Sequence, residues 1–184
     1  MKRQLIKSCA LLLLLLAAMP FFSSCKNTSA EKRLEYAKSR FCAKISGKVN
    51  ENEVYATLYS DPEAENGAAR ATLVFSQPKG LEGIAVTLFA NGECGVRIGD
   101  STLSADRAHD ILKPYFPVFS VGEVYSSESL GNGGERIRVC DENCDLIYTF
   151  EENSDYPHRI QGVYFGNNID FLIEDFAFNF DFQK

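Results

Sequence analysis

The 184-residue sequence contains no tryptophan and only two histidines, His109 and His158. It contains no G-x-S-x-G nucleophile motif, no H-E-x-x-H zinc motif and no Walker-type phosphate loop. A composition of 45% hydrophobic and 24% charged residues excludes a disordered chain, a collagen-like repeat and a polytopic membrane protein. With no catalytic residue and no cofactor indicated, we expect a globular chain that is not an enzyme.

Acidic residues are missing from the first part of the chain, where none precedes Glu31. Lys2, Arg3 and Lys7 precede a strongly apolar run at residues 10–22. Removing residues 1–24 leaves 16 basic against 25 acidic side chains, a net charge of −9. Because nucleic-acid binding needs a basic surface, this balance excludes nucleic acid as the default partner.

The amino terminus has the order of a secretory signal: basic start, short apolar stretch, small residues. The 14 apolar residues from Cys9 to Phe22 are fewer than the roughly 20 that a spanning helix needs. A retained signal-anchor helix is the alternative. Phe22-Ser23-Ser24-Cys25 resembles the lipobox of bacterial lipoproteins. That resemblance implies cleavage before Cys25 and a diacylglyceryl group on its sulfur, with two or more acyl chains giving a stable anchor.

The division expected from this resemblance is a signal peptide at 1–24, a lipidated tether at 25–33 and one β domain at 34–184. It implies a location on the cell membrane or the outer membrane, facing outside the cytoplasm. Lys26 follows the cysteine where a retention signal would have aspartate, so in a cell with two membranes no inner-membrane retention is implied.

Most of the remaining sequence alternates between apolar and polar residues, which predicts strands. Helical spacing predicts only two helices, at 30–41 and 106–116, the second ended by Pro114 and Pro117. Phe176, Phe178, Phe180 and Phe182 fall on one face of the last strand. The predicted strands cover residues 41–49, 53–60, 70–77, 84–90, 93–98, 135–140, 145–150, 159–165 and 169–182.

This pattern predicts a mainly β (α+β) fold: a curled antiparallel sheet, or half-barrel, with two short helices covering its apolar face. A flat sheet of about nine strands would expose more apolar surface than two helices can cover, so it must curl or split. The order of elements around Pro78-Lys79-Gly80-Leu81-Glu82-Gly83-Ile84 and Pro157-His158-Arg159-Ile160 resembles the LolA-like lipoprotein carriers over roughly residues 31–184. That resemblance implies an apolar cavity for acyl chains.

We therefore expect a membrane-anchored protein that binds a lipid or other hydrophobic ligand, as a carrier or chaperone for lipidated molecules. The alternative is a surface adaptor that binds protein or glycan and has a filled core. The expected partners are the membrane, through the Cys25 lipid, and the hydrophobic ligand, while a protein partner stays open. The residues expected to line the cavity are Leu58, Leu73, Phe75, Val86, Leu88, Phe176, Phe178 and Phe180.

Four cysteines follow Cys25, and in an exported domain they predict one or two disulfides. The favoured pairing is Cys140–Cys144, across the turn Asp141-Glu142-Asn143, with Cys42–Cys94. Other pairings, and free thiols in a source without oxygen, stay open. No metal site is expected, because the cysteines lack paired zinc-ligand spacing and the acidic loops lack the spacing of a calcium-binding loop.

Overall fold

The computed structural model describes residues 28–65, 67–104, 112–116 and 123–179. The helical segments are α2 (Thr28–Arg33) and the 3₁₀ turns η1 (Leu34–Lys38) and η3 (Lys113–Tyr115). The strands are β1 (Phe41–Val49), β2 (Asn52–Ser60), β3 (Ala69–Gln77), β4 (Ala85–Phe89), β5 (Cys94–Ile98), β6 (Ser101–Ser104), β7 (Glu123–Ser129), β8 (Glu135–Cys140), β9 (Cys144–Phe150), β10 (Arg159–Tyr164) and β11 (Asn167–Phe178).

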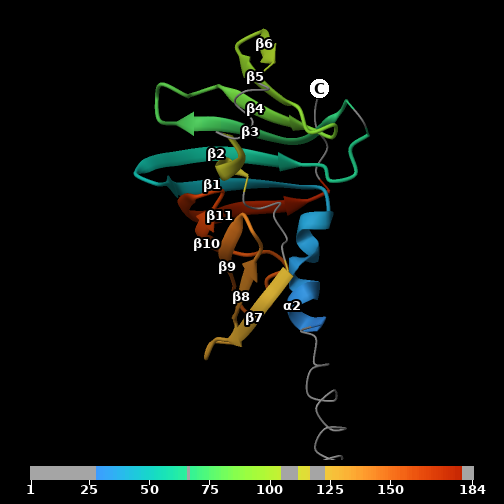
Figure 1. Ribbon diagram of the computed structural model, residues 1–184, viewed down its shortest axis with the longest axis vertical. Coiled ribbons are helices and arrows are strands. Elements are labelled where there is room, and N and C mark those ends of the chain that lie inside the picture. The colour runs from blue at the N-terminus through green and yellow to red at the C-terminus, as the bar shows by residue number, and fades with distance from the viewer. Residues whose placement is uncertain (1–27, 66, 105–111, 117–122, 180–184) are drawn as a thin grey trace, which may run out of the picture.

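All eleven described strands belong to one antiparallel sheet, in the order β6-β5-β4-β3-β2-β1-β11-β10-β9-β8-β7. The sheet is strongly curled, so that β7 to β9 lie at a large angle to β1 to β4 (Figure 1). It does not close, because β6 and β7 are its two edges. This confirms the predicted curled antiparallel half-barrel.

The chain leaves the centre of the sheet, reaches one edge and returns from the other. β1 to β6 follow one another outward, whereas β7 to β11 lead back inward. The first and last strands therefore pair at the centre, with Phe41 opposite Phe178 and Val49 opposite Ile169. The described part of the connection between β6 and β7, residues 112–116, packs against the core through buried Phe116.

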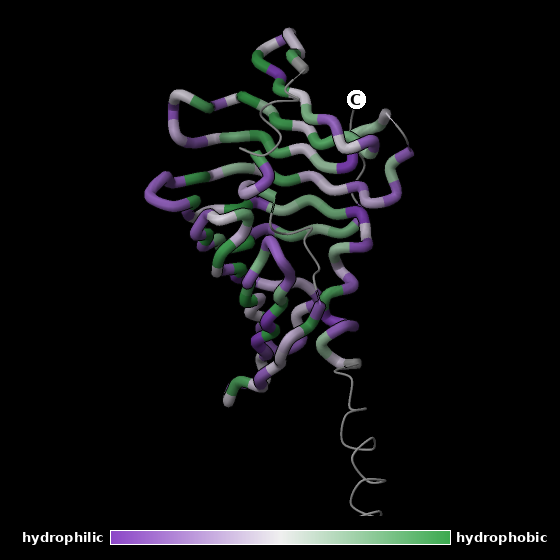
Figure 2. The backbone as a smooth tube through the Cα atoms, in the orientation of Figure 1, coloured by the Kyte–Doolittle hydropathy of each residue, from purple (hydrophilic) through white to green (hydrophobic). Residues whose placement is uncertain are grey.

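The core lies on one side of the sheet, which we call the concave face. Hydrophobic and hydrophilic positions alternate along the strands (Figure 2), as expected when one face is buried. In β1, Phe41, Ala43 and Ile45 are buried, while Lys44 between them is exposed. One continuous cluster includes buried residues from α2, η1 and both halves of the sheet. The two halves of the sheet therefore share a single core.

A β-bulge divides β11 into two parts. Ile169, Phe171 and Ile173 are buried up to the bulge. Lys44 pairs with Glu174 but Cys42 pairs with Ala177, so β11 holds one extra residue there, and Asp175 has a φ of 47°. The extra residue moves the inward positions from odd to even numbers. It explains why the apolar stripe continues at Phe176 rather than at Asp175.

The first helix prediction was wrong in extent. The segment predicted as a helix at 30–41 is α2 followed by η1, and Phe41 already pairs in the sheet. Residues 28–33, expected at the end of the tether, form α2, whose Ala30 is fully buried. Most of the helix predicted at 106–116 lies outside the described residues, and its described end holds the turn η3.

Candidate functional site

Four of the eight residues predicted to line a cavity are buried in the core. Leu58 and Leu73 expose no surface, and Phe75 and Val86 expose 4% and 3%. Leu58 and Leu73 lie in packed interior, and Phe75 and Val86 are nearly buried beside them on β3 and β4. Of the described residues that were predicted to line a cavity, Leu88 lines the pocket next to this core.

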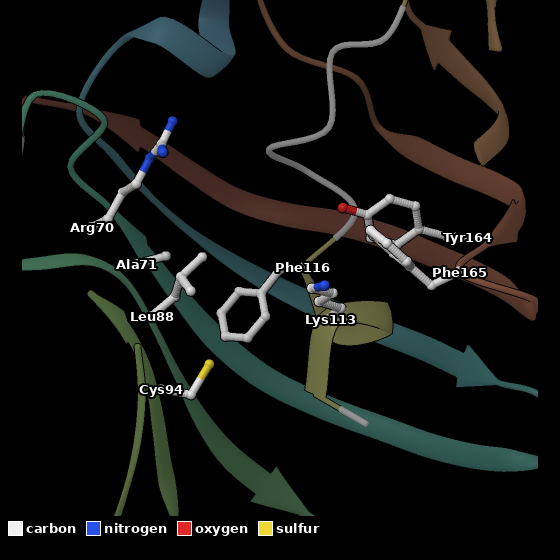
Figure 3. A pocket seen from close by; sticks show the side chains of 8 residues that line it. All are labelled: Arg70, Ala71, Leu88, Cys94, Lys113, Phe116, Tyr164 and Phe165. Atoms are coloured by element: carbon white, nitrogen blue, oxygen red, sulfur yellow. The ribbon is translucent and has the colours of Figure 1, made fainter. Parts of the chain in front are cut away.

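This pocket has a volume of about 220 Å³ and lies on the concave face, over β3, β4 and β5. Figure 3 shows side chains from the strands on one side and from the connection and the β10–β11 turn on the other. Apolar and aromatic groups make up most of the wall. Its described lining residues are Arg70, Ala71, Leu88, Cys94, Lys113, Phe116, Tyr164 and Phe165.

The strand side of the pocket depends on a bulge in β3. Ala69 pairs with Phe89 and Ala71 pairs with Leu88, which leaves Arg70 as the extra residue. In a regular strand Arg70 and Ala71 would point to opposite faces. Because a bulge turns a side chain from its regular direction, both neighbours line the same pocket.

The opposite side is formed by two short turns. Pro114 lies within the turn η3, which places Lys113 and Phe116 against the pocket. The turn after β10 holds Phe165 at a φ of 46°, with its ring 4.7 Å from that of Tyr164. Lys113 Nζ lies 4.9 Å from the centre of the Phe165 ring, a cation–π distance. The two turns therefore contact each other beside the pocket.

The charge of this site differs from that of the whole chain. The described lining residues include two cations, Arg70 and Lys113, and no carboxylate. The chain as a whole has a net charge of −6. The pocket therefore combines apolar walls with positive charge in an otherwise acidic protein.

A second feature is an aromatic cluster where β1, β11 and η1 meet. The Phe176 ring stacks on Tyr156 at 4.3 Å and on Phe41 at 4.8 Å, and the Phe178 ring lies 4.9 Å away. Phe176 is partly buried in this cluster, whereas Phe178 is 39% exposed and lines a separate polar groove beside α2 and η1. Phe180 and Cys25 lie outside the described residues.

The predicted disulfide Cys140–Cys144 is not present, and the strand register gives the reason. Cys140 pairs with Asp145, and its Sγ donates a hydrogen bond to that carboxylate at 3.3 Å. Cys144 is one residue away from Asp145 and is buried with the concave core. The two sulfurs therefore point to opposite faces of the sheet.

The predicted pair Cys42–Cys94 is also not joined. These cysteines lie on β1 and β5, with three strands between them. Four inter-strand spacings correspond to about 19 Å along the sheet, far beyond the reach of a disulfide. Burial raises the pKa of the Cys42 thiol, and burial with the Asp145 hydrogen bond raises that of Cys140, which makes both poor nucleophiles at neutral pH.

Neither a metal-binding cluster nor a spanning helix is found in the described part of the chain. The His, Cys, Asp and Glu side chains of these residues form no group able to hold a metal ion. The helices of this part lack the length and the apolar character needed to cross a membrane.

No family model matches this sequence, and no curated protein is significantly similar to it. Similar solved structures include an uncharacterized conserved protein from Thermus thermophilus, with a TM-score of 0.53 and 15% identity over 83% of this chain and 87% of that one. A LolA superfamily protein from Nitrosomonas europaea has a TM-score of 0.40 and 9% identity, over 83% and 94% of the two chains. LprF from Mycobacterium bovis has a TM-score of 0.42 and 11% identity, over 84% and 94%. The likeness to the Thermus protein is one of fold.

Proposed function

We propose that this chain is a lipid-anchored extracytoplasmic lipoprotein that binds an acyl chain or another hydrophobic ligand without chemically changing it. The observation that carries the proposal is the apolar pocket beside Leu88, Cys94 and Phe116 on the concave face. The amino-terminal signal and the resemblance to LolA-like carriers, both drawn from the sequence, supply the anchor and the ligand class.

The driving force for binding would be desolvation of the ligand. Each buried CH₂ group contributes about 0.8 kcal/mol. A volume of about 220 Å³ is below the roughly 300–1,000 Å³ of sites for drug-sized ligands, so the pocket fits part of one chain rather than a two-chain phospholipid. We therefore propose a ligand with a single accessible chain.

The test is native mass spectrometry of residues 26–184, followed by lipid extraction and titration with decanoate. Leu88→Trp would place an indole in the pocket and is expected to remove bound ligand and weaken decanoate binding at least tenfold. Val74→Trp is the matched control. Val74 is a half-buried residue of β3 that faces away from the concave side on which the pocket lies. Circular dichroism of both variants checks that the sheet remains folded.

A surface adaptor remains the second candidate, because apolar side chains are exposed on the convex face. Tyr55 and Leu172 are 38% and 44% exposed, and both are register partners of Ser46, so they flank it on β2 and β11. If residues 26–184 carry no ligand and Leu88→Trp does not change decanoate binding, the adaptor is the better description.

A further inference from the structure

The bulge in β3 places a cation at a pocket whose other strand residues are apolar. Arg70 would point away from the pocket in a regular strand, but with the extra residue it lines the pocket together with Ala71 and Leu88. Bulges are over-represented next to functional sites, where they re-aim a side chain. A site for a purely apolar ligand would gain nothing from a guanidinium here.

The second cation lies across the pocket. Figure 3 shows Arg70 extending from the strand side and Lys113 standing on the side of the connection. Lys113 is held near Phe165 at a cation–π distance. Among the described residues, no carboxylate lies in the lining and no ion pair is formed by Arg70. The exposed Arg70 can therefore meet an anion at the mouth.

Apolar and charged groups are separated within the pocket. Leu88, Cys94 and Phe116 form the part over the sheet, with Cys94 and Phe116 almost fully buried. A guanidinium presents a planar fork of donors that fits a carboxylate or a phosphate. An amphipathic ligand would place its chain against the apolar part and its head group against the cations.

We infer that this pocket selects a single acyl chain with an anionic head group, either a carboxylate or a phosphate, held by Arg70 and Lys113. The inference rests on the proposed function, because it specifies the ligand of the same pocket.

The experiment compares decanoate, decyl phosphate and decanol by isothermal titration calorimetry with residues 26–184. Both anions are expected to bind at least tenfold more tightly than the alcohol, since a hydrogen bond to a charged group is worth that much. Their relative affinities identify which head group the site prefers. The advantage of the anions is expected to shrink between about 0.05 and 0.5 M salt, because a cation at the pocket mouth is screened.

Arg70→Met removes the charge of the side chain and keeps most of its apolar stem. It is expected to lower the affinity for both anions about tenfold and leave that for decanol unchanged. Arg97→Met is the matched control, because Arg97 is exposed on β5 and does not line the pocket. Lys113→Met is expected to act in the same direction as Arg70→Met.

The outcomes separate the inference from the proposed function. Equal binding of all three ligands, or an equal loss for all three in Arg70→Met, would overturn the anionic preference and leave hydrophobic binding intact. Absence of binding for all three ligands would overturn both.

Discussion

Charged side chains on the convex face form cross-strand pairs, one of which joins Arg138 and Asp145. Arg138 on β8 donates from Nε and Nη2 to the two carboxylate oxygens of Asp145 on β9, at 2.7 and 2.6 Å. This bidentate contact lowers the pKa of Asp145 to about 2. Both side chains are nearly half exposed, at 44% and 47%, so solvent screens the pair and its contribution to stability is small.

The pH dependence of this pair gives a residue-scale prediction. Because the pKa of Asp145 is lower in the folded chain, the pair stabilises the fold above the ordinary aspartate pKa, and this contribution is lost as pH falls through about 2. Arg138→Met is therefore expected to be less stable than the unmodified chain at pH 7, with the difference shrinking as the pH approaches 2. Urea unfolding at pH 7, 4 and 2 measures the difference. A difference that stays constant with pH would show that Arg138 acts through packing on Tyr125 instead.

The curvature of the sheet depends on glycine positions, where the backbone of a neighbouring strand comes close because no side chain lies between. At Gly47 of β1, an added Cβ would lie 1.9 Å from the backbone oxygen of Asp170 on β11. At Gly162 of β10, the nearest atom would be the backbone oxygen of Asp145, at 2.1 Å. The two tight contacts therefore lie between β1 and β11 and between β10 and β9. A sheet curls where a glycine or a bulge permits it.

Gly47→Ala tests this at the scale of the element. The clash is with backbone, which cannot move without breaking the β1–β11 ladder, so we expect a loss of about 3 kcal/mol or more in the free energy of unfolding. Gly131→Ala is the control, because nothing lies within 4 Å of its added Cβ. Chemical denaturation of both variants measures the loss. A Gly47→Ala chain as stable as Gly131→Ala would show that the sheet can flatten at this point.

Alternation in the sequence was enough to predict most of the strands and the curled sheet. In a strand with one buried face, every second residue points to the core and is apolar. The edge strands β6 and β7 were missed, since an edge strand contacts solvent on more than one side. Leu103 and Tyr125 on these strands are 57% and 70% exposed. Their sequences therefore carry little of the pattern that marks β1 or β9.

The pocket was harder to predict than the sheet. Leu88 was expected at the site from its alternation, but Arg70 was not, because alternation places it on the face opposite Ala71. A bulge shifts register by one residue and leaves no periodic signal of its own. Lys113, Phe116 and Phe165 come from turns, whose positions depend on how the sheet curls rather than on local sequence. Leu58 and Leu73 were predicted to line a cavity and are fully buried. The sequence could not separate the two cases, since an inward apolar residue is equally consistent with core and with cavity.

At the scale of the molecule, the position of α2 sets how far the domain could extend from an anchor at Cys25. Only Lys26 and Asn27 separate Cys25 from the start of α2, whose Ala30 is already part of the core. Three residue steps span at most about 11 Å. With the lipid on Cys25, the half-barrel would lie beside the membrane. Its pocket would then be close to acyl chains that leave the bilayer.

Cys25→Ser is the test of the anchor in the full chain. The substitution removes the sulfur that would carry the diacylglyceryl group, so we expect an unprocessed precursor that incorporates no fatty-acid probe. Cys42→Ser is the matched control, because Cys42 lies within β1 and should leave both labelling and processing unchanged. Labelling that persists in Cys25→Ser would remove the anchor from the proposal.

The pairing of the first strand with the last also governs the order in which the chain can fold. Each half of the sheet is a series of neighbouring hairpins, which close short loops and can form early. The ladder between Phe41 and Phe178 must join residues from opposite ends of the domain, and loop closure over such a distance is slow. Until β11 arrives, the inner edges of both halves stay unpaired beside their apolar faces. Until this ladder forms, a newly made chain therefore depends on whatever keeps those two edges from pairing with other chains.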